Sequence, residues 1–198
     1  MSMPAMTSAT AHNGTAPLLV PRTRAWTQAE LGAFVLQHHA FAWRMVRRLG
    51  VMESSVDDAV QQVFMVVTSK LGGVEIGKER SFLVSTIIRV AANARRAQAR
   101  VLEQPWNDEP PEIASDAPTP EESLSQAQRR ALLDEVLAPL PLEMRTVFVL
   151  AELEGMSAPE IASLIETPVG TVTSRLRRAR ELVERQVRVV RAKHGGPS

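Results

Sequence analysis

The stretch from Ser157 to Arg180 constrains the fold most, because it joins two helical patterns through a tight break. Ser157 followed by Glu160 is the pattern of a capping box, in which each side chain satisfies a free amide at a helix start. Pro168 suits the first position of a second helix. On that helix the apolar residues recur at steps of three and four: Val169, Val172, Leu176, Ala179 and Val183. The stretch therefore predicts a short helix, a turn and a longer helix.

The opposite face of the second predicted helix carries hydroxyl and guanidinium groups. These side chains are Thr173, Ser174, Arg177 and Arg178. A helix anchored by its apolar side and offering such groups on the other side suits the major groove of DNA. Charged residues also serve simply to solvate a helix face. The short helix and tight turn that precede this one favour DNA binding over that alternative.

The same spacing predicts helices in the first half of the chain. Thr27 and Glu30 form another capping box ahead of a long apolar stripe, and Ser55 with Asp58 is expected to cap the next helix. That helix has a continuous apolar side, formed by Val56, Ala59, Val60, Val63, Phe64, Val67 and Leu71. A third helix is expected from about Arg80. The fold class is therefore all-α.

Composition divides the chain into two small helical domains. Residues 1–25 are rich in Ala, Thr, Ser and Pro, and predict a disordered tail. Residues 104–118 are acidic and Pro-rich, which predicts a flexible linker. The first domain is expected at 26–103 and the second at 119–191. Residues 192–198 are expected to form a second disordered tail, after a last helix that continues through Val190.

Charge and cysteine content narrow the class of protein. The net charge is only +1, but residues 168–198 carry eight basic and two acidic side chains, a segregation typical of nucleic-acid binding. The chain has no Cys, which excludes disulfides and thiolate metal sites. It has no apolar run of about 20 residues and no signal sequence. These features predict a soluble cytoplasmic protein.

Two further polar faces are candidate binding surfaces. Asp58, Gln61, Gln62 and Met65 share one face of the second helix, which is either simply solvated or docks a protein. Arg89, Asn93, Arg96 and Arg100 form one stripe on the third helix. Such a row fits a line of phosphates, with a solubilising face as the alternative.

No pattern for enzyme chemistry is found. His38 and His39 are adjacent and point to different faces, so they make no paired metal site. The Gly-rich loop at residues 71–79 lacks the spacing and ending of a phosphate-binding loop. We therefore expect no catalytic residue, metal or cofactor.

Several motifs resemble a known family. Pro168 to Arg180, preceded by Arg145 to Ser157, resembles region 4 of the extracytoplasmic-function (ECF) group of bacterial sigma factors, in the sigma-70 family. Val56 to Val67 is similar to region 2.2 of that group, and Ser81 to Arg96 is similar to its regions 2.3 and 2.4. The resemblance covers about residues 26–191, in the same order and with an acidic linker between the regions.

The resemblance implies a transcription initiation factor for a specific, stress-responsive regulon. Region 2 would dock on the clamp helices of the largest subunit of core RNA polymerase, read the −10 promoter element and help open the strands. Region 4 would contact the flap of the second-largest subunit and read the −35 element in the major groove. An anti-sigma factor is an expected partner, whereas membrane insertion and an obligate homo-oligomer are not expected.

The resemblance also assigns three sets of residues. The −35 set is Thr171, Thr173, Ser174, Arg175, Arg177 and Arg178. The −10 set is Lys78, Arg80, Phe82, Arg89, Asn93, Arg96 and Arg100. In region 2.2 the resemblance matches Asp58, Gln61, Gln62 and Phe64, of which Phe64 lies on the apolar stripe and is expected to support the core. The docking set, for core polymerase, is Asp58, Gln61 and Gln62 together with Met65 of the same exposed face. The loop from Gly72 to Lys78 matches the place where the family holds a flipped base.

Three positions depart from the family pattern. Phe82 stands where Trp is usual, and Gln62 replaces a usual acid. Glu166 stands where the turn often has Gly, so a left-handed residue there would cost about 1–2 kcal/mol. An autonomous helix-turn-helix regulator and a polymerase-binding adaptor are the alternative functions.

Overall fold

Residues 23–103 and 120–194 are described by the computed structural model, and they form helices and connecting turns with no β-strand among them. This confirms the expected all-α class. The predicted linker at 104–118 lies outside the described residues, as does most of the predicted N-terminal tail. No helix within the described ranges has the length and apolar character needed to cross a membrane.

Three long helices form the first half of the fold: α1 (Gln28–Arg48), α2 (Val56–Lys70) and α3 (Glu79–Glu103). The capping box predicted for α1 is present, because the Glu30 amide donates to Thr27 Oγ1 at 3.2 Å and the Thr27 amide donates to Glu30 Oε2 at 2.8 Å. Gly50 follows α1 with a φ of 95°, a left-handed conformation that favours glycine. The chain therefore turns sharply between α1 and α2.

The start of α2 differs from the expectation. A 3₁₀ turn, η1 (Glu53–Ser55), leads directly into the helix. The Ser55 amide donates to the Met52 carbonyl at 2.9 Å, and its side chain makes no capping hydrogen bond. The predicted Ser55–Asp58 cap is thus wrong, because the preceding 3₁₀ turn already fixes the backbone conformation at Ser55. The apolar stripe of α2 is buried along its full length, as predicted.

The second half holds α4 (Pro120–Leu137), α5 (Leu142–Phe148), α6 (Ala158–Leu164) and α7 (Val169–His194). A π-helical turn, η3 (Val149–Leu153), extends α5. The last helix continues past Val190 to His194, so residues 192–194 are helical and the tail expected from 192 begins too early.

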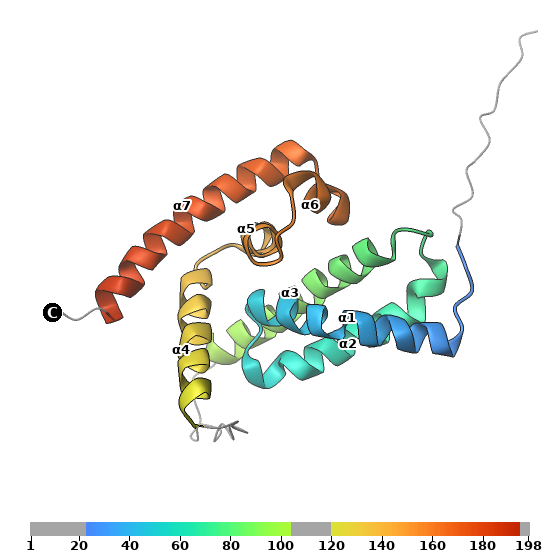
Figure 1. Ribbon diagram of the computed structural model, residues 1–198, viewed down its shortest axis with the longest axis horizontal. Coiled ribbons are helices and arrows are strands. Elements are labelled where there is room, and N and C mark those ends of the chain that lie inside the picture. Colours follow the sequence, from blue (N-terminus) through green and yellow to red (C-terminus); the bar gives the residue numbers. More distant parts are fainter. Residues whose placement is uncertain (1–22, 104–119, 195–198) are drawn as a thin grey trace, which may run out of the picture.

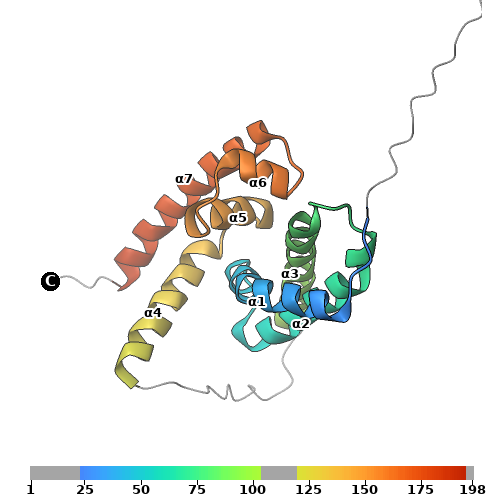
Figure 2. The same cartoon turned by 45° about the vertical axis from the view of Figure 1, so that its right-hand side comes forward.

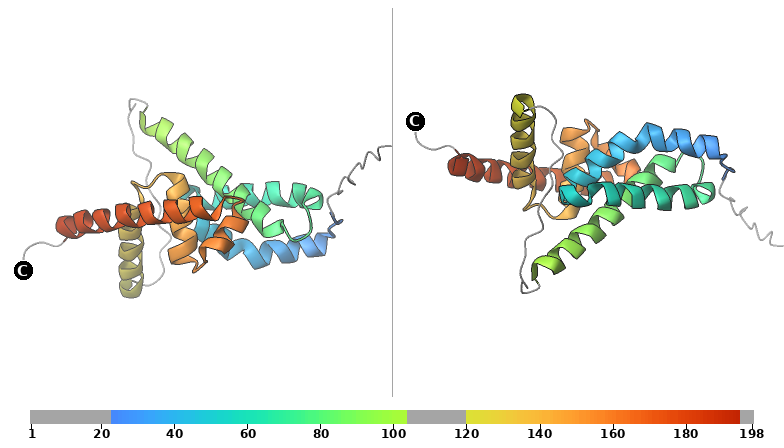
Figure 3. Two further views of the ribbon diagram at one scale, coloured as in Figure 1. Left: turned by 90° about the horizontal axis from the view of Figure 1, so that it is seen from above. Right: turned by 90° about the horizontal axis from the view of Figure 1, so that it is seen from below.

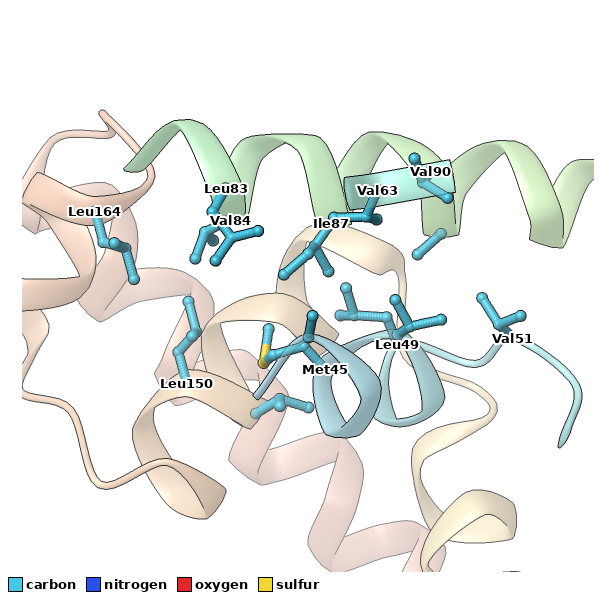
Figure 4. Close-up of a cluster of buried hydrophobic side chains, with 14 of the residues drawn as sticks. Met45, Leu49, Val51, Val63, Leu83, Val84, Ile87, Val90, Leu150 and Leu164 are labelled. Atoms are coloured by element: carbon cyan, nitrogen blue, oxygen red, sulfur yellow. The ribbon is translucent and has the colours of Figure 1, made fainter. Parts of the chain in front are cut away.

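The two halves lie side by side, with α1–α3 on one side and α4–α7 on the other (Figures 1 and 2). The C-terminal ends of α3 and α7 project from the body in the views from above and below (Figure 3). A single apolar cluster runs through both halves. In Figure 4 it joins Met45 of α1 and Leu83 of α3 to Leu150 and Leu164 of the second half. The halves therefore share a core rather than merely touching.

Candidate nucleic-acid interface

The helix-turn-helix predicted from the sequence is formed by α6 and α7. Ser157 and Glu160 complete a capping box at the start of α6, with the Ser157 amide donating to Glu160 Oε2 at 2.8 Å. Glu160 is a cap acceptor, and the hydrogen bonds from Ser157 lower the pKa of its carboxyl group. Glu166 turns the chain with a φ of 50°, a left-handed conformation that costs a non-Gly residue about 1–2 kcal/mol.

One face of α7 anchors the helix. Val172, Leu176 and Ala179 are buried as predicted, and Val183 is half-buried. Val169 was expected on the same face but is 46% exposed. It is the first residue of α7, so no preceding turn of the helix packs beside it.

The opposite face of α7 is open to solvent. Thr173, Ser174, Arg177 and Arg178 are all exposed, as the spacing predicted. Thr173 Oγ1 donates to the Val169 carbonyl and Ser174 Oγ donates to the Thr171 carbonyl, both at 3.0 Å. Each hydroxyl oxygen keeps lone pairs for an external donor. The remaining members of the −35 set, Thr171 and Arg175, are half-buried at the edge of this face.

The −10 set divides into two groups in the structure. Arg89, Asn93, Arg96 and Arg100 are exposed along α3, and the Arg96 guanidinium donates to Asn93 Oδ1. Arg96 and Arg100 belong to the last turns of α3, whose C-terminal end projects from the body (Figure 3). These four side chains are thus accessible to a row of DNA phosphates in the folded chain.

The other group lies against α6 and the turn that follows it. Lys78 Nζ is 3.9 Å from Glu166 Oε1. Phe82 is half-buried and lines a cavity of about 300 Å³ together with Lys78, Leu164 and Glu166. The Arg80 guanidinium lies 5.8 Å from the centroid of the Phe41 ring of α1. Lys78 and Phe82, two of the residues expected at the opened strand, therefore face the second half of the chain.

The docking set is accessible on α2. All four residues are exposed, and Met65 shows 66% of its surface to solvent. Gln61 and Met65 line a groove of about 520 Å³ between α1 and α2, whose other walls include His39 and Phe64. The His39 ring stacks on Phe64 with ring centroids 6.0 Å apart, while His38 is half-buried. The groove extends the docking surface onto α1, which the spacing of the polar residues on α2 did not predict.

A buried arginine between the halves was not predicted. Arg145 of α5 is only 3% exposed. Its Nε donates to the Arg48 carbonyl, and its Nη1 donates to the Leu137 carbonyl at 3.2 Å. Burial lowers the pKa of Arg145 to about 10, with the charge of Arg95 adding to the shift. The only sequence signal for this role is a charged residue within an otherwise apolar stretch.

Ion pairs surround Arg145 at the same junction. Glu154, whose side chain is 11% exposed, pairs with Arg48 Nη1 and with Arg44 Nη2, the latter at 3.3 Å. Arg47 Nη2 lies 2.6 Å from Asp134 Oδ2 of α4. Burial raises the pKa of the Asp134 carboxyl, although Arg47 opposes the shift. The C-terminal end of α1 is therefore linked to the second half by several polar contacts.

Comparisons with known proteins agree with this geometry. The family model described as "Sigma-70, region 4" matches residues 130–183. The chain is 31% identical over 168 residues to "RNA polymerase sigma factor NccH" of Alcaligenes xylosoxydans xylosoxydans, covering 82% of this chain and 89% of that protein. It is 28% identical over 148 residues to "ECF RNA polymerase sigma-E factor" of Haemophilus influenzae, covering 69% and 77%.

A solved structure has the same fold. It is the sigma factor RpoE in complex with the anti-sigma factor NepR from Bartonella quintana. The similarity covers 80% of this chain and 96% of that one, with a TM-score of 0.56 and 16% sequence identity.

Proposed function

The chain belongs to the ECF group of sigma factors in the sigma-70 family, and from that premise we propose how its exposed surfaces divide the work of promoter recognition. Sigma factors are transcription initiation factors, not enzymes. We propose that α4–α7 act as region 4 and read the −35 element, while α1–α3 act as region 2. In this proposal the first domain spans 26–103, and the second spans 119–194 because α7 continues to His194.

The exposed face of α7 is the observation that carries the −35 assignment. The solvent-facing side of α7 lies opposite the buried residues that anchor the helix. It carries Thr173, Ser174, Arg177 and Arg178. Hydroxyl and guanidinium groups at the N-terminal half of a recognition helix can reach base edges in the major groove. Thr171 and Arg175, at the edge of that face, would hold phosphates.

The docking set supports attachment to core polymerase. Met65 and its polar neighbours are exposed beside a groove between α1 and α2, which suits a helical partner. We propose that the clamp helices of the largest subunit occupy this surface, and that the flap of the second-largest subunit contacts region 4. Polymerase then fixes the distance between the two domains, so that binding of the second DNA element becomes intramolecular.

An anti-sigma partner is the second element of the proposal. The Bartonella quintana structure of the same fold holds a sigma factor bound to an anti-sigma factor. We propose that a protein inhibitor also controls this chain, and that the chain acts in the cytoplasm, where polymerase and chromosome are found.

In vitro transcription tests the proposed function directly. The purified chain is mixed with core RNA polymerase on a genomic library, and RNA 5′ ends are mapped. Start-site-specific RNA that depends on the chain, together with co-purification of the chain and core enzyme, is the expected result. A chain that binds a palindromic operator tightly without polymerase would instead be an autonomous regulator.

A further inference from the structure

We propose that a cavity between the C-terminal end of α1 and α4 binds a diphosphate group, either as inorganic pyrophosphate or as part of a nucleoside diphosphate. The cavity has a volume of about 230 Å³. Four arginines and a tryptophan line most of it: Arg44, Arg47, Arg48, Arg130 and Trp43. None of them belongs to the −35, −10 or docking sets, so the site goes beyond promoter recognition.

The four guanidinium groups converge on the cavity from two helices. Arg44, Arg47 and Arg48 stand at positions i, i+3 and i+4 of α1, so their side chains share one face of the helix. Arg130 comes from α4, one helical turn before Asp134. The C-terminal end of a helix favours cations in its last turn. That effect does not account for Arg44, which precedes the last turn of α1, or for Arg130, which lies on another helix.

Carboxylates at the junction accept only part of what these groups offer. Among the described residues that line the cavity, only Asp134 is acidic, and its Oδ2 lies 2.6 Å from Arg47 Nη2. Glu53 adds a longer contact of 3.6 Å with the same atom. Glu154 is shared between two of the α1 arginines. Each guanidinium group carries five N–H donors, so four of them offer more donors than three carboxylates accept.

The arginines are accessible to an anion from solvent. The side chain of Arg44 is 44% exposed, and Arg130 is exposed as well. A planar guanidinium group binds two phosphate oxygens at once, which makes arginine well suited to phosphate groups. Pockets that enclose a whole drug-sized ligand have volumes of about 300–1,000 Å³. The smaller cavity here fits a diphosphate group, and the rest of a nucleotide would extend beyond it.

Trp43 provides a fixed aromatic wall beside the arginines. Its Nε1 donates to Asp57 Oδ1 at 2.9 Å, which holds the indole ring in one orientation. Leu133 of α4 adds an apolar side chain to the same cavity. A nucleobase can stack on such a ring, whereas inorganic pyrophosphate has no group that stacks. The contribution of Trp43 therefore distinguishes the two sources of the diphosphate group.

Isothermal titration calorimetry on the full chain tests the site. The titrants are sodium pyrophosphate, ADP and GDP, at about 150 mM sodium chloride so that weak surface attraction is screened. The variant Arg44→Gln/Arg130→Gln removes one exposed guanidinium group from each helix. The matched control is Arg129→Gln/Arg188→Gln, which removes two exposed arginines that do not line the cavity. The single variants and Trp43→Leu are titrated in parallel, and circular dichroism checks the fold of each protein.

We expect the natural chain to bind pyrophosphate saturably with one site per chain. The dissociation constant should rise at least tenfold in Arg44→Gln/Arg130→Gln and change less than twofold in the control. Each cavity single variant should raise it at least threefold, which keeps the test decisive if the double variant unfolds. No saturable binding of any titrant by the natural chain, or equal weakening in cavity and control variants, would overturn the site.

The titrations also identify the source of the diphosphate group. If a nucleotide is the ligand, ADP or GDP binds more tightly than pyrophosphate and loses that advantage in Trp43→Leu. If pyrophosphate is the ligand, the nucleotides have no advantage and Trp43→Leu binds pyrophosphate as the natural chain does. Both results support a diphosphate site. Binding is measured on the chain alone, so it does not depend on the outcome of the transcription experiment.

Discussion

Arg145 donates a hydrogen bond from Nε to the backbone carbonyl of Arg48, although the two residues stand 97 positions apart in the sequence. The contact joins α5 to the end of α1 in a place where Arg145 is almost fully buried. Removing a buried charge-assisted hydrogen bond leaves unpaired groups and costs more than an exposed ion pair does. We therefore expect the free energy of unfolding to depend on whether the Arg145 side chain has enough space to make this hydrogen bond.

Gly50→Ala should destabilise the protein through that space. Gly50 has a φ of 95°, and a Cβ there would lie 2.8 Å from Arg145 Nη1. The left-handed backbone alone costs about 1–2 kcal/mol for an L-residue, and displacement of Arg145 adds to that. Urea unfolding followed by circular dichroism measures the change. Gly77→Ala is the matched control, since Gly77 also has a positive φ, of 91°, but no atom lies within 4 Å of a new Cβ there. Equal loss in both variants would contradict the role of Arg145.

Arg178→Ala should lower −35-dependent transcription while leaving core binding unchanged. Arg178 is exposed on the proposed reading face of α7, and a base contact of this kind contributes about 1–3 kcal/mol of discrimination. That corresponds to roughly a 5- to 150-fold loss in promoter-specific transcription. Arg191→Ala, about 20 Å further along the same helix, removes the same charge as a control. Comparable losses in transcription and co-purification would show that Arg178 has another role.

Asp58→Ala with Gln61→Ala should weaken the association with core polymerase. Both side chains are exposed on α2, so the substitutions leave the core of the fold intact. Surface plasmon resonance with immobilised core enzyme should show a dissociation constant raised several-fold or more. Glu184→Ala and Arg185→Ala together, on exposed positions of α7, control for changes to polar surface residues. An unchanged dissociation constant would refute the docking assignment.

Glu30→Gln with Glu160→Gln should flatten the pH dependence of stability. Hydrogen bonds from Thr27 lower the pKa of the Glu30 carboxyl, and hydrogen bonds from Ser157 lower that of Glu160, both from an ordinary value of 4.5. A carboxyl whose pKa is lower in the folded state stabilises the fold above its unfolded pKa, and that contribution is lost as pH falls through the folded pKa.

The free energy of unfolding of the variant should therefore lie below that of the natural chain at pH 7. The two should converge in acid, below the lowered pKa values. Glutamine keeps a hydrogen-bonding group at both capping positions, so the comparison isolates the charge. Urea titrations at several pH values measure it, and curves that stay parallel into acid would contradict the prediction.

Local sequence patterns were sufficient for the elements of this fold. The capping boxes at Thr27 and Ser157 and the buried stripe of α2 all follow from short-range chemistry. Two of the three local errors, at Ser55 and Val169, fall at helix starts, where neighbouring turns decide how a residue packs. The third is the end of α7, which continues to His194. The exposed face of α7 could be predicted because a helix with one apolar side buries that side and leaves the opposite side in solvent.

The packing of the two halves could not be read from the same patterns. A stripe such as that of α3 shows which residues are buried, but not that Leu164 of the other half lies in the same cluster. Arg145 looks like a surface charge until two helix ends meet around it. Lys78 and Arg89 likewise appear as one basic set in the sequence, although only Lys78 contacts the second half.

The π-helical turn at Val149–Leu153 bears on the ion pairs between the two halves. Such a turn contains one residue more than an α-helical turn, so its conversion to regular α-helix would rotate the following residues by about 100°. Glu154 follows it directly and would swing away from Arg44 and Arg48. This local change in one helix would thus break the two ion pairs that join Glu154 to α1.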